Sequence, residues 1–407
     1  MFYYQYQGCC LASLEEALPF EKKESCGDGE VIFLFRRTPL AGRDSFAVTD
    51  CGLFTAEEGS ETLSRTAPLA VDADLAKAVE EGRVRAVNYA HPRWEELLAP
   101  MEMGKKRVHM LALGDVGSTM LTALRLIGGD VISTIGICDV REEVTARWEF
   151  EMEQVAYPWE YDKLPKVEVV SQDDLFHCDV FLFCASRFVP DTAVKSGDVR
   201  MAQYALNREL VAMYAKRARE AKYKGLFCIV SDPVDQLCRA ALVASNKNDA
   251  GETDFMGLFT RQVRGFGLGV MNARAAYYAK RDQRFAAFLT EGRAYGPHGQ
   301  GLIIANSVEN YDNALSLELT DLTQNANLAM RRLGFKPYVA PALSSAAISV
   351  VLLLKGEWHY SSSYLGGIFM GGKNRFGGEV EIERLALPEA LMKRIRETMT
   401  YLASIEP

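Results

Sequence analysis

The chain has 407 residues and a net charge of −8, and 48% of its residues are hydrophobic while 25% are charged. This composition is typical of a globular protein that is long enough for two or three domains. The acidic balance argues against nucleic acid as the main partner, because phosphate backbones require a basic surface. No uncharged apolar run reaches the roughly 18 residues of a membrane-spanning helix, so we expect no membrane partner.

The first region, residues 1–104, mixes strand-like and helix-like runs, and we expect a small accessory α+β domain of open role. Strands are predicted at Val31–Phe35, Ser45–Thr49 and Val84–Tyr89, and helices at Ala73–Glu81 and Arg93–Leu98. The aromatic start, MFYYQY, is a candidate exposed arm for interactions. Because this start lacks the basic segment of a signal peptide, we expect a cytoplasmic protein.

The nine cysteines are odd in number and irregularly spaced. Cys9, Cys10, Cys26 and Cys51 cluster near the start of the chain, but they lack the paired CxxC knuckles of zinc sites. We therefore expect reduced thiols that act as small hydrophobic side chains, and no metal.

The second region, residues 105–264, alternates buried-strand and helix patterns. Strands are predicted at Arg107–Leu113, Val131–Cys138, Phe176–Phe183 and Gly225–Val230, with helices at Ser118–Ile127 and Val199–Lys222. Such alternation predicts an α/β fold with a parallel sheet and right-handed crossovers, as in Rossmann-type nucleotide-binding domains.

A glycine turn, Gly114-Asp115-Val116-Gly117, joins the first of these strands to its helix. Glycine lets the backbone approach a pyrophosphate, and the helix N-terminus supplies free N–H groups. Asp139 ends the next strand, where a carboxylate binds a ribose 2′-hydroxyl and repels a 2′-phosphate. The motif therefore predicts NAD rather than NADP, although Ala112 occupies the first position of the GxGxxG pattern. The alternative is a plain tight turn.

The third region, residues 265–407, mixes helices and strands, and we expect it to be the substrate domain. Helices are predicted at Ala273–Thr290, Leu315–Leu333 and Leu387–Ser404, and a loop between two strands at Gly371–Gly378.

Five short motifs in these two regions resemble those of the lactate/malate dehydrogenase family, in the same order. They are LALGDVGSTM with the later ICDV, RMAQYALN, VSDPVD, the Gly267–Arg274 segment and GPHG. The resemblance implies a Rossmann NAD domain followed by an α+β catalytic domain. It implies an NAD-dependent enzyme that interconverts a 2-hydroxy acid and a 2-keto acid, and it implies a homodimer or homotetramer. The first hundred residues lie outside the resemblance.

The resemblance also implies roles for single residues. His298 would exchange the proton at the substrate C2 oxygen, because imidazole can both donate and accept a proton near neutral pH. Arg274 would bind the substrate carboxylate with its planar fork. Arg200 would polarise the C2 carbonyl from a closing loop, and Asn207 would contact cofactor and substrate. Ordinary surface or helix-face residues are the alternative at each of these positions.

The sequence departs from the family pattern at two positions. The family has an aspartate three residues before the substrate arginine, where this chain has Met271, and methionine cannot accept a useful hydrogen bond from imidazole. Asp232 stands where the family has asparagine. We hypothesise that Asp232 lies beside His298 and supplies the missing carboxylate. Val230, just upstream on the same strand, is expected to contact the cofactor.

The favoured function is an active NAD-dependent 2-hydroxy-acid dehydrogenase. The alternative is a catalytically silent NAD-binding protein of the same fold, acting as a sensor or structural partner, and Met271 is its main support. A third reading, an NAD- and metal-dependent glycosidase, would need a Cys/His metal pair that we do not find in register. The segment between Arg187 and Arg200, which contains Lys195, looks longer than in the family. The sequence therefore does not select one 2-hydroxy acid.

Overall fold

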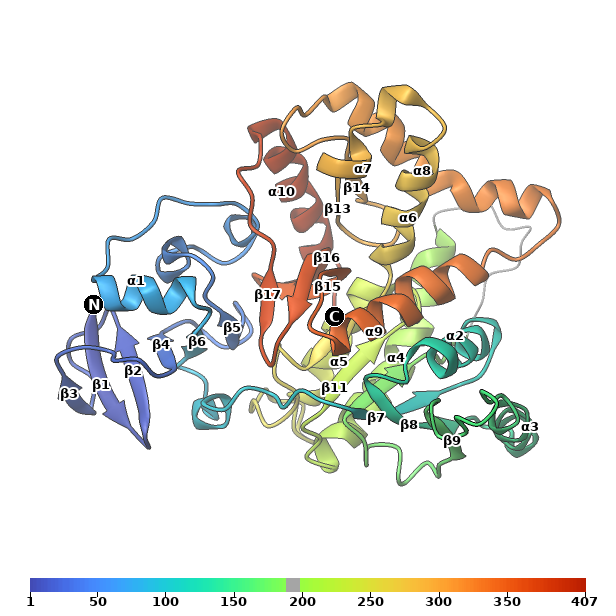
Figure 1. Ribbon diagram of the computed structural model, residues 1–407, viewed down its shortest axis with the longest axis horizontal. Coiled ribbons are helices and arrows are strands. Elements are labelled where there is room, and N and C mark those ends of the chain that lie inside the picture. The colour runs from blue at the N-terminus through green and yellow to red at the C-terminus, as the bar shows by residue number, and fades with distance from the viewer. Residues whose placement is uncertain (188–197) are drawn as a thin grey trace.

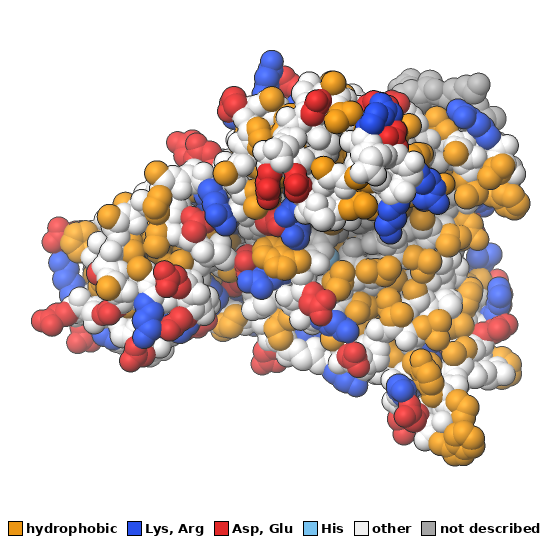
Figure 2. All heavy atoms as spheres, turned by 45° about the horizontal axis from the view of Figure 1, so that its top comes forward, with side chains coloured by type: hydrophobic (Ala, Val, Ile, Leu, Met, Phe, Trp, Pro, Cys, Tyr) orange, Lys and Arg blue, Asp and Glu red, His pale blue; other side chains and the backbone are white. Residues whose placement is uncertain are grey.

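The computed structural model describes residues 1–187 and 198–407, and for residues 198–202 it describes only the backbone. The chain builds a nine-stranded sheet in the main body and a six-stranded sheet in an N-terminal lobe. The lobe projects from the left side of the body (Figure 1). In the space-filling view, acidic and basic side chains are mixed on the visible face of this lobe (Figure 2).

Six neighbouring strands of the nine-stranded sheet are parallel. They are β7 (Lys106–Leu111), β8 (Ile132–Cys138), β9 (Lys166–Val169), β10 (Val180–Phe183), β11 (Leu226–Ile229) and β12 (Val263–Gly265). Their spatial order is β9-β8-β7-β10-β11-β12, which is the doubly wound order of a Rossmann domain. The predicted parallel sheet is confirmed. Ligands of such sheets bind at the carboxyl ends of the strands, where the order reverses between β7 and β10.

Helices alternate with these strands and bury them. They are α2 (Asp115–Ile127), α3 (Glu142–Glu153), α4 (Asp198–Glu220) and α5 (Val234–Ser245). All four residues of β10 and of β11 are buried, which explains why their sequences are continuous apolar runs. Helix α2 begins at Asp115, three residues earlier than predicted, because Gly114 is its N-cap.

Three C-terminal strands extend the same sheet beyond β12 in antiparallel fashion: β15 (His359–Leu365), β16 (Ile368–Phe376) and β17 (Val380–Ile382). The predicted loop at Gly371–Gly378 is therefore wrong, since β16 runs through most of it. A Cβ at Gly371 would lie 2.5 Å from the carbonyl oxygen of Gly296. Glycine serves close packing at this position, and it does not mark a turn.

The remaining C-terminal elements cover one end of this sheet. They are α6 (Leu268–Ala279), α7 (Phe288–Glu291), the ribbon β13 (Arg293–Tyr295) and β14 (Ile303–Ala305), α8 (Asn313–Arg332), the π-helical turn η5 (Pro341–Ala347), α9 (Ile348–Leu354) and α10 (Glu389–Ala403). The single helix predicted at Ala273–Thr290 is wrong. The chain leaves α6 after Ala279, and the Asp282 carboxylate then caps a separate short turn by accepting the Arg284 N–H.

The N-terminal lobe contains β1 (Phe2–Tyr6), β2 (Cys9–Ser13), β3 (Glu21–Lys23), β4 (Val31–Phe35), β5 (Ser45–Ala47), β6 (Val84–Asn88) and the helix α1 (Ala73–Glu80). The prediction of an exposed aromatic arm is wrong, because the first residues form β1 inside the sheet. Tyr3 and Tyr4 are buried, and the Tyr3 hydroxyl donates to Asp72, the residue that caps α1.

A buried carboxylate joins the lobe to the body. Glu379, just before β17, accepts hydrogen bonds from Ser45 (2.7 Å) and Arg85 (3.4 Å) of the lobe and from Arg261 of the body. Asp44 and Thr260 exchange two further hydrogen bonds of 2.8 Å across the same boundary. These hydrogen bonds join the lobe to the body through buried side chains. In the part of the chain that the structure describes, no helix combines the length and the hydrophobicity needed to cross a bilayer.

Candidate active site

The glycine turn lies between the end of β7 and the start of α2, at the reversal point of the sheet. A Cβ at Gly117 would lie 2.1 Å from the carbonyl oxygen of Ala112, so this position requires glycine. A Cβ at Gly114 would meet no described atom within 4 Å, which leaves open space at the N-terminus of α2. Ala112 itself has φ = +73°, in the left-handed region where the GxGxxG pattern has its first glycine.

The predicted ribose acid lies beside this turn. The Asp139 carboxylate accepts the backbone N–H groups of Leu113 (2.8 Å) and Arg141 (3.2 Å). Its position just after β8 is therefore fixed relative to the turn. Val116, in the first turn of α2, and Val230, just after β11, are half-buried at the same edge of the sheet.

The turn and the acid together fit a dinucleotide. The close approach at Gly117, the open space beside Gly114 and the free N–H groups of a helix N-terminus suit a pyrophosphate. The anchored Asp139 suits a ribose 2′-hydroxyl. The fold brings the glycine turn, Asp139 and Val230 together at the carboxyl edge of the parallel sheet.

His298 lies in the loop between β13 and β14, and its Nδ1 atom is 3.0 Å from Oδ1 of Asp232. The histidine side chain is 16% exposed, so it is largely shielded but accessible. A Cβ at Gly267 would come within 2.8 Å of the His298 Cβ, so glycine there lets the histidine pack against the start of α6. The structure thus places the two side chains of the carboxylate hypothesis at hydrogen-bond distance.

Arg274 and Met271 lie one turn apart on α6, and Nη1 of Arg274 is 3.7 Å from the Met271 sulfur. Met271 is buried among the apolar side chains under α6. Burial lowers the pKa of Arg274, and the negative charge of Asp232 is close enough to oppose this shift. Asp232 therefore contacts His298 and lies within electrostatic range of Arg274.

Asn207 is fully buried on α4 and makes its hydrogen bonds to the protein. Its side-chain oxygen accepts from the Ser186 hydroxyl (3.2 Å) and the Arg187 N–H (3.0 Å). Its amide group donates to the Asp232 carbonyl oxygen at 2.9 Å. Asn207 thus ties the segment after β10 to the residue that contacts His298, and contact with cofactor or substrate stays a prediction.

Part of the predicted substrate loop lies outside the described residues, including Lys195. The backbone of Arg200 belongs to the first turn of α4, but its side chain also lies outside them. Arg187 forms an ion pair of 3.0 Å with Glu209 of α4. The roles expected for Arg200 and Lys195 stay predictions.

Asp235 was not singled out by the sequence, although it closes the Asp-Pro-Val-Asp string. It is buried in the first turn of α5, and the Ser362 hydroxyl donates to it at 2.7 Å. Burial raises its pKa to about 6, while that bond and the nearby His298 favour the ionised form. The only signal in the sequence was its position three residues after Asp232.

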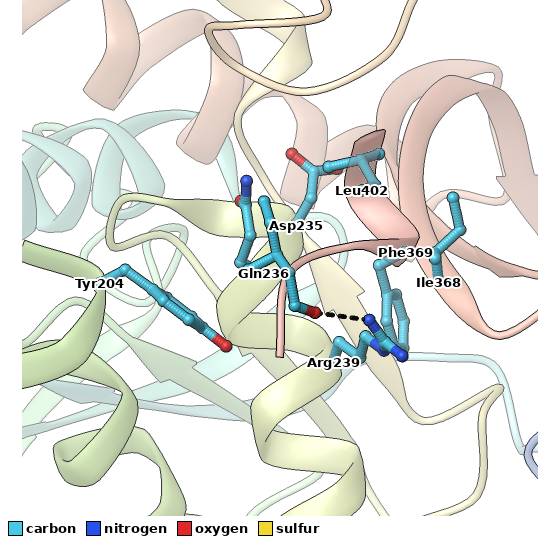
Figure 3. Close-up of a pocket in the computed structure, with 8 residues that line it drawn as sticks. Tyr204, Asp235, Gln236, Arg239, Ile368, Phe369 and Leu402 are labelled. Atoms are coloured by element: carbon cyan, nitrogen blue, oxygen red, sulfur yellow. Dashed lines mark hydrogen bonds between the residues drawn. The ribbon is translucent and has the colours of Figure 1, made fainter. Parts of the chain in front are cut away.

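A small cavity lies beside Asp235, between Tyr204, Arg239 and Leu402 (Figure 3). Its volume of about 10 Å³ is enough for no more than one water molecule. Arg239 closes one side by donating to the Ile405 carbonyl oxygen at 2.8 Å. This cavity is therefore not a substrate site.

Known proteins of one class are similar to this chain. No family model matches it. An L-lactate dehydrogenase from Treponema denticola is 27% identical over 208 residues, which are 51% of this chain and 59% of that protein. The match thus spans less than two thirds of that relative.

Solved structures extend the likeness over more of the chain. A minor L-lactate dehydrogenase from Enterococcus mundtii has a TM-score of 0.58 at 19% identity, covering 73% of this chain and 96% of that one. A malate dehydrogenase from Archaeoglobus fulgidus, in complex with NADH, has a TM-score of 0.58 at 17% identity, covering 73% and 97%. These likenesses show a shared fold.

Proposed function

We propose that this chain is a member of the lactate/malate dehydrogenase family and an NAD-dependent oxidoreductase that interconverts a 2-hydroxy acid and a 2-keto acid, because the proteins similar to it in sequence and fold are lactate and malate dehydrogenases. The observation that carries this proposal is the 3.0 Å contact between His298 Nδ1 and Asp232 Oδ1, with Arg274 within electrostatic range of Asp232. A histidine oriented by a carboxylate, next to an arginine, provides proton exchange and carboxylate binding in one place.

The proposal gives each of these groups a role. Arg274 binds the substrate carboxylate and so orients the C2 atom. The Nδ1 atom of His298 faces Asp232, which leaves Nε2 to exchange the proton with the C2 oxygen. Asp232 stabilises the imidazolium form and holds the ring in place. The bound nicotinamide cofactor supplies or accepts the hydride.

The proposed cofactor is NAD. Asp139 lies where a 2′-phosphate would bring a second negative charge next to its carboxylate, which disfavours NADP. The fit of the glycine turn to a pyrophosphate supports the same assignment.

The experiment is NADH oxidation by the purified protein against a panel of 2-keto acids, with NADH affinity measured by fluorescence. We expect turnover with at least one of them and a loss of about 10²–10⁴-fold in kcat for His298→Ala. NADH affinity should change little in this variant. Failure of the wild-type protein to bind NADH would overturn the proposal.

One observation favours the catalytically silent alternative. Met271 is buried beside Arg274 in the place where the family has an aspartate. In that case the wild-type protein would bind NADH tightly and show no turnover across the whole panel.

We further propose a homodimer or homotetramer, on the basis of the family. Light scattering coupled to gel filtration should then give two or four times the chain mass of 45.2 kDa. A mass equal to that of one chain would contradict this assembly.

A further inference from the structure

A lysine from the C-terminal half of the chain reaches the glycine turn of the NAD domain. Lys336 lies in the segment between α8 and η5, which returns toward α2 (Figure 1). Its Nζ atom is 3.0 Å from Oδ2 of Asp115, the first residue of α2. η5 packs directly on α2, so this segment is held close to the turn.

Asp115 creates an electrostatic problem for the proposed cofactor. It contributes a carboxylate to the first turn of α2, at the helix end where the pyrophosphate would bind. A pyrophosphate carries negative charge and would be repelled by a carboxylate a few ångströms away. The ammonium group of Lys336 neutralises this carboxylate and adds N–H donors at the same place.

We propose that Lys336 binds the pyrophosphate of the cofactor, and that Asp115 holds the lysine over the glycine turn before the cofactor arrives. The inference rests on the proposed NAD-binding function. The side chains of Lys336 and Asp115 are 67% and 49% exposed, and exposed ion pairs are weak. The ammonium group can therefore turn toward a phosphate, and its three donors allow it to contact Asp115 and the phosphate together.

The same helix offers a matched control. Lys355 pairs with Asp130, just beyond the C-terminal end of α2, at 3.4 Å. Both pairs join the C-terminal half of the chain to an aspartate at or near an end of α2, but only Lys336 lies at the end with the glycine turn. Lys336→Met and Lys355→Met remove one charge each and keep most of the side-chain volume.

The test measures the affinities of the two variants and the wild-type protein for NADH, ADP-ribose and adenosine by calorimetry. We expect Lys336→Met to lower the affinity for NADH and for ADP-ribose about 10-fold or more, because a charge-assisted hydrogen bond is lost. Adenosine, which lacks a pyrophosphate, should bind to Lys336→Met as tightly as to the wild-type protein. Lys355→Met should have the wild-type affinity for all three ligands. Adding Asp115→Asn to Lys336→Met should restore part of the affinity, since the repulsion is then removed.

The two possible failures are distinguishable. If the wild-type protein binds NADH and Lys336→Met binds it equally well, the role of Lys336 is wrong and the proposed function stands. If Lys336→Met lowers the affinity for adenosine as much as the affinity for NADH, the lysine does not act on the pyrophosphate. If the wild-type protein does not bind NADH, the proposed function fails and this inference fails with it.

Discussion

Asp232 is the residue on which the site depends most. It follows β11, whereas the aspartate of the family pattern lies on the helix that carries the substrate arginine. Its carboxylate lies 3.0 Å from His298 and also acts on the charge of Arg274. Arg274 therefore has an anionic neighbour before any substrate binds. We expect this neighbour to weaken the binding of simple 2-keto acids relative to a site in which the arginine meets only the substrate.

Replacing Arg274 tests whether its planar guanidinium group is required for substrate binding. Arg274→Lys keeps the charge but loses the bidentate geometry that matches a carboxylate. We expect KM for the 2-keto acid to rise about 10-fold to 100-fold, with NADH affinity unchanged. Arg281→Lys, just past the end of α6, is the control. Equal KM values in Arg274→Lys and the wild-type protein would show that Arg274 does not bind the substrate.

Asp235 predicts a pH dependence of stability. Its pKa is raised to about 6 in the folded protein, above its value of 3.8 in an unfolded chain. The folded state therefore binds this proton more tightly, and the favourable contribution of the neutral acid is lost as the pH rises from about 4 to about 6. Relative to Asp235→Asn, the wild-type protein should lose about 2 kcal/mol of unfolding free energy between pH 4 and pH 7. Urea unfolding at a series of pH values would measure this difference. If the unfolding free energies of the wild-type protein and Asp235→Asn changed in parallel with pH, the prediction would be contradicted.

At the scale of the elements, the strand–turn–helix unit β7–α2 shows why the nucleotide motif could be predicted from the sequence. The last four residues of β7, Val108–Leu111, are all buried and mostly apolar, and the backbone of Ala112 requires glycine at Gly117. Both features are local, so the sequence alone predicts them. The strand through Gly371 was predicted wrongly, because its glycine packs against the distant Gly296. The helix boundary after Ala279 was also predicted wrongly, because the local cap formed by Asp282 was not recognised.

Two glycines of this unit should respond differently to the same substitution. Gly117→Ala places a Cβ against a backbone carbonyl and should destabilise the fold by about 3 kcal/mol. Gly114→Ala adds a methyl group to open space at a negative φ, so stability without cofactor should change by less than about 1 kcal/mol. Thermal and urea unfolding would compare the stabilities of the two variants. Equal losses of unfolding free energy in Gly117→Ala and Gly114→Ala would contradict the packing described for this turn.

At the scale of the whole molecule, the N-terminal lobe is fastened to the body by buried charges. Glu379 is buried and is bonded by two arginines, one from each part of the chain. The sequence placed a boundary near residue 104, but it could not show this contact, because Arg85 and Glu379 are 294 residues apart. The contact between Lys336 and Asp115 was missed for the same reason.

Removing Glu379 should loosen the lobe. Glu379→Ala leaves the buried Arg261 without its carboxylate, whereas Arg85 keeps its ion pair with Glu30 at 2.9 Å, so we expect a cost of about 3 kcal/mol of unfolding free energy. Glu381→Ala, on the same side of the molecule in β17, removes only the partner of the exposed Arg375 and should cost less than about 1 kcal/mol. Calorimetry and limited proteolysis around residues 99–104 would compare the two variants. If Glu379→Ala and Glu381→Ala showed similarly small losses of unfolding free energy, Glu379 would not hold the lobe in place.

The most direct test of the proposed active site is the turnover of Asp232→Asn with NADH and the 2-keto acid that the wild-type protein accepts. The amide keeps the size of the side chain but cannot stabilise an imidazolium as a carboxylate does. We predict a loss of at least about 10²-fold in kcat, with NADH affinity and thermal stability close to those of the wild-type protein. A kcat within about twofold of the wild-type value would contradict the assignment of Asp232 as the carboxylate that serves His298.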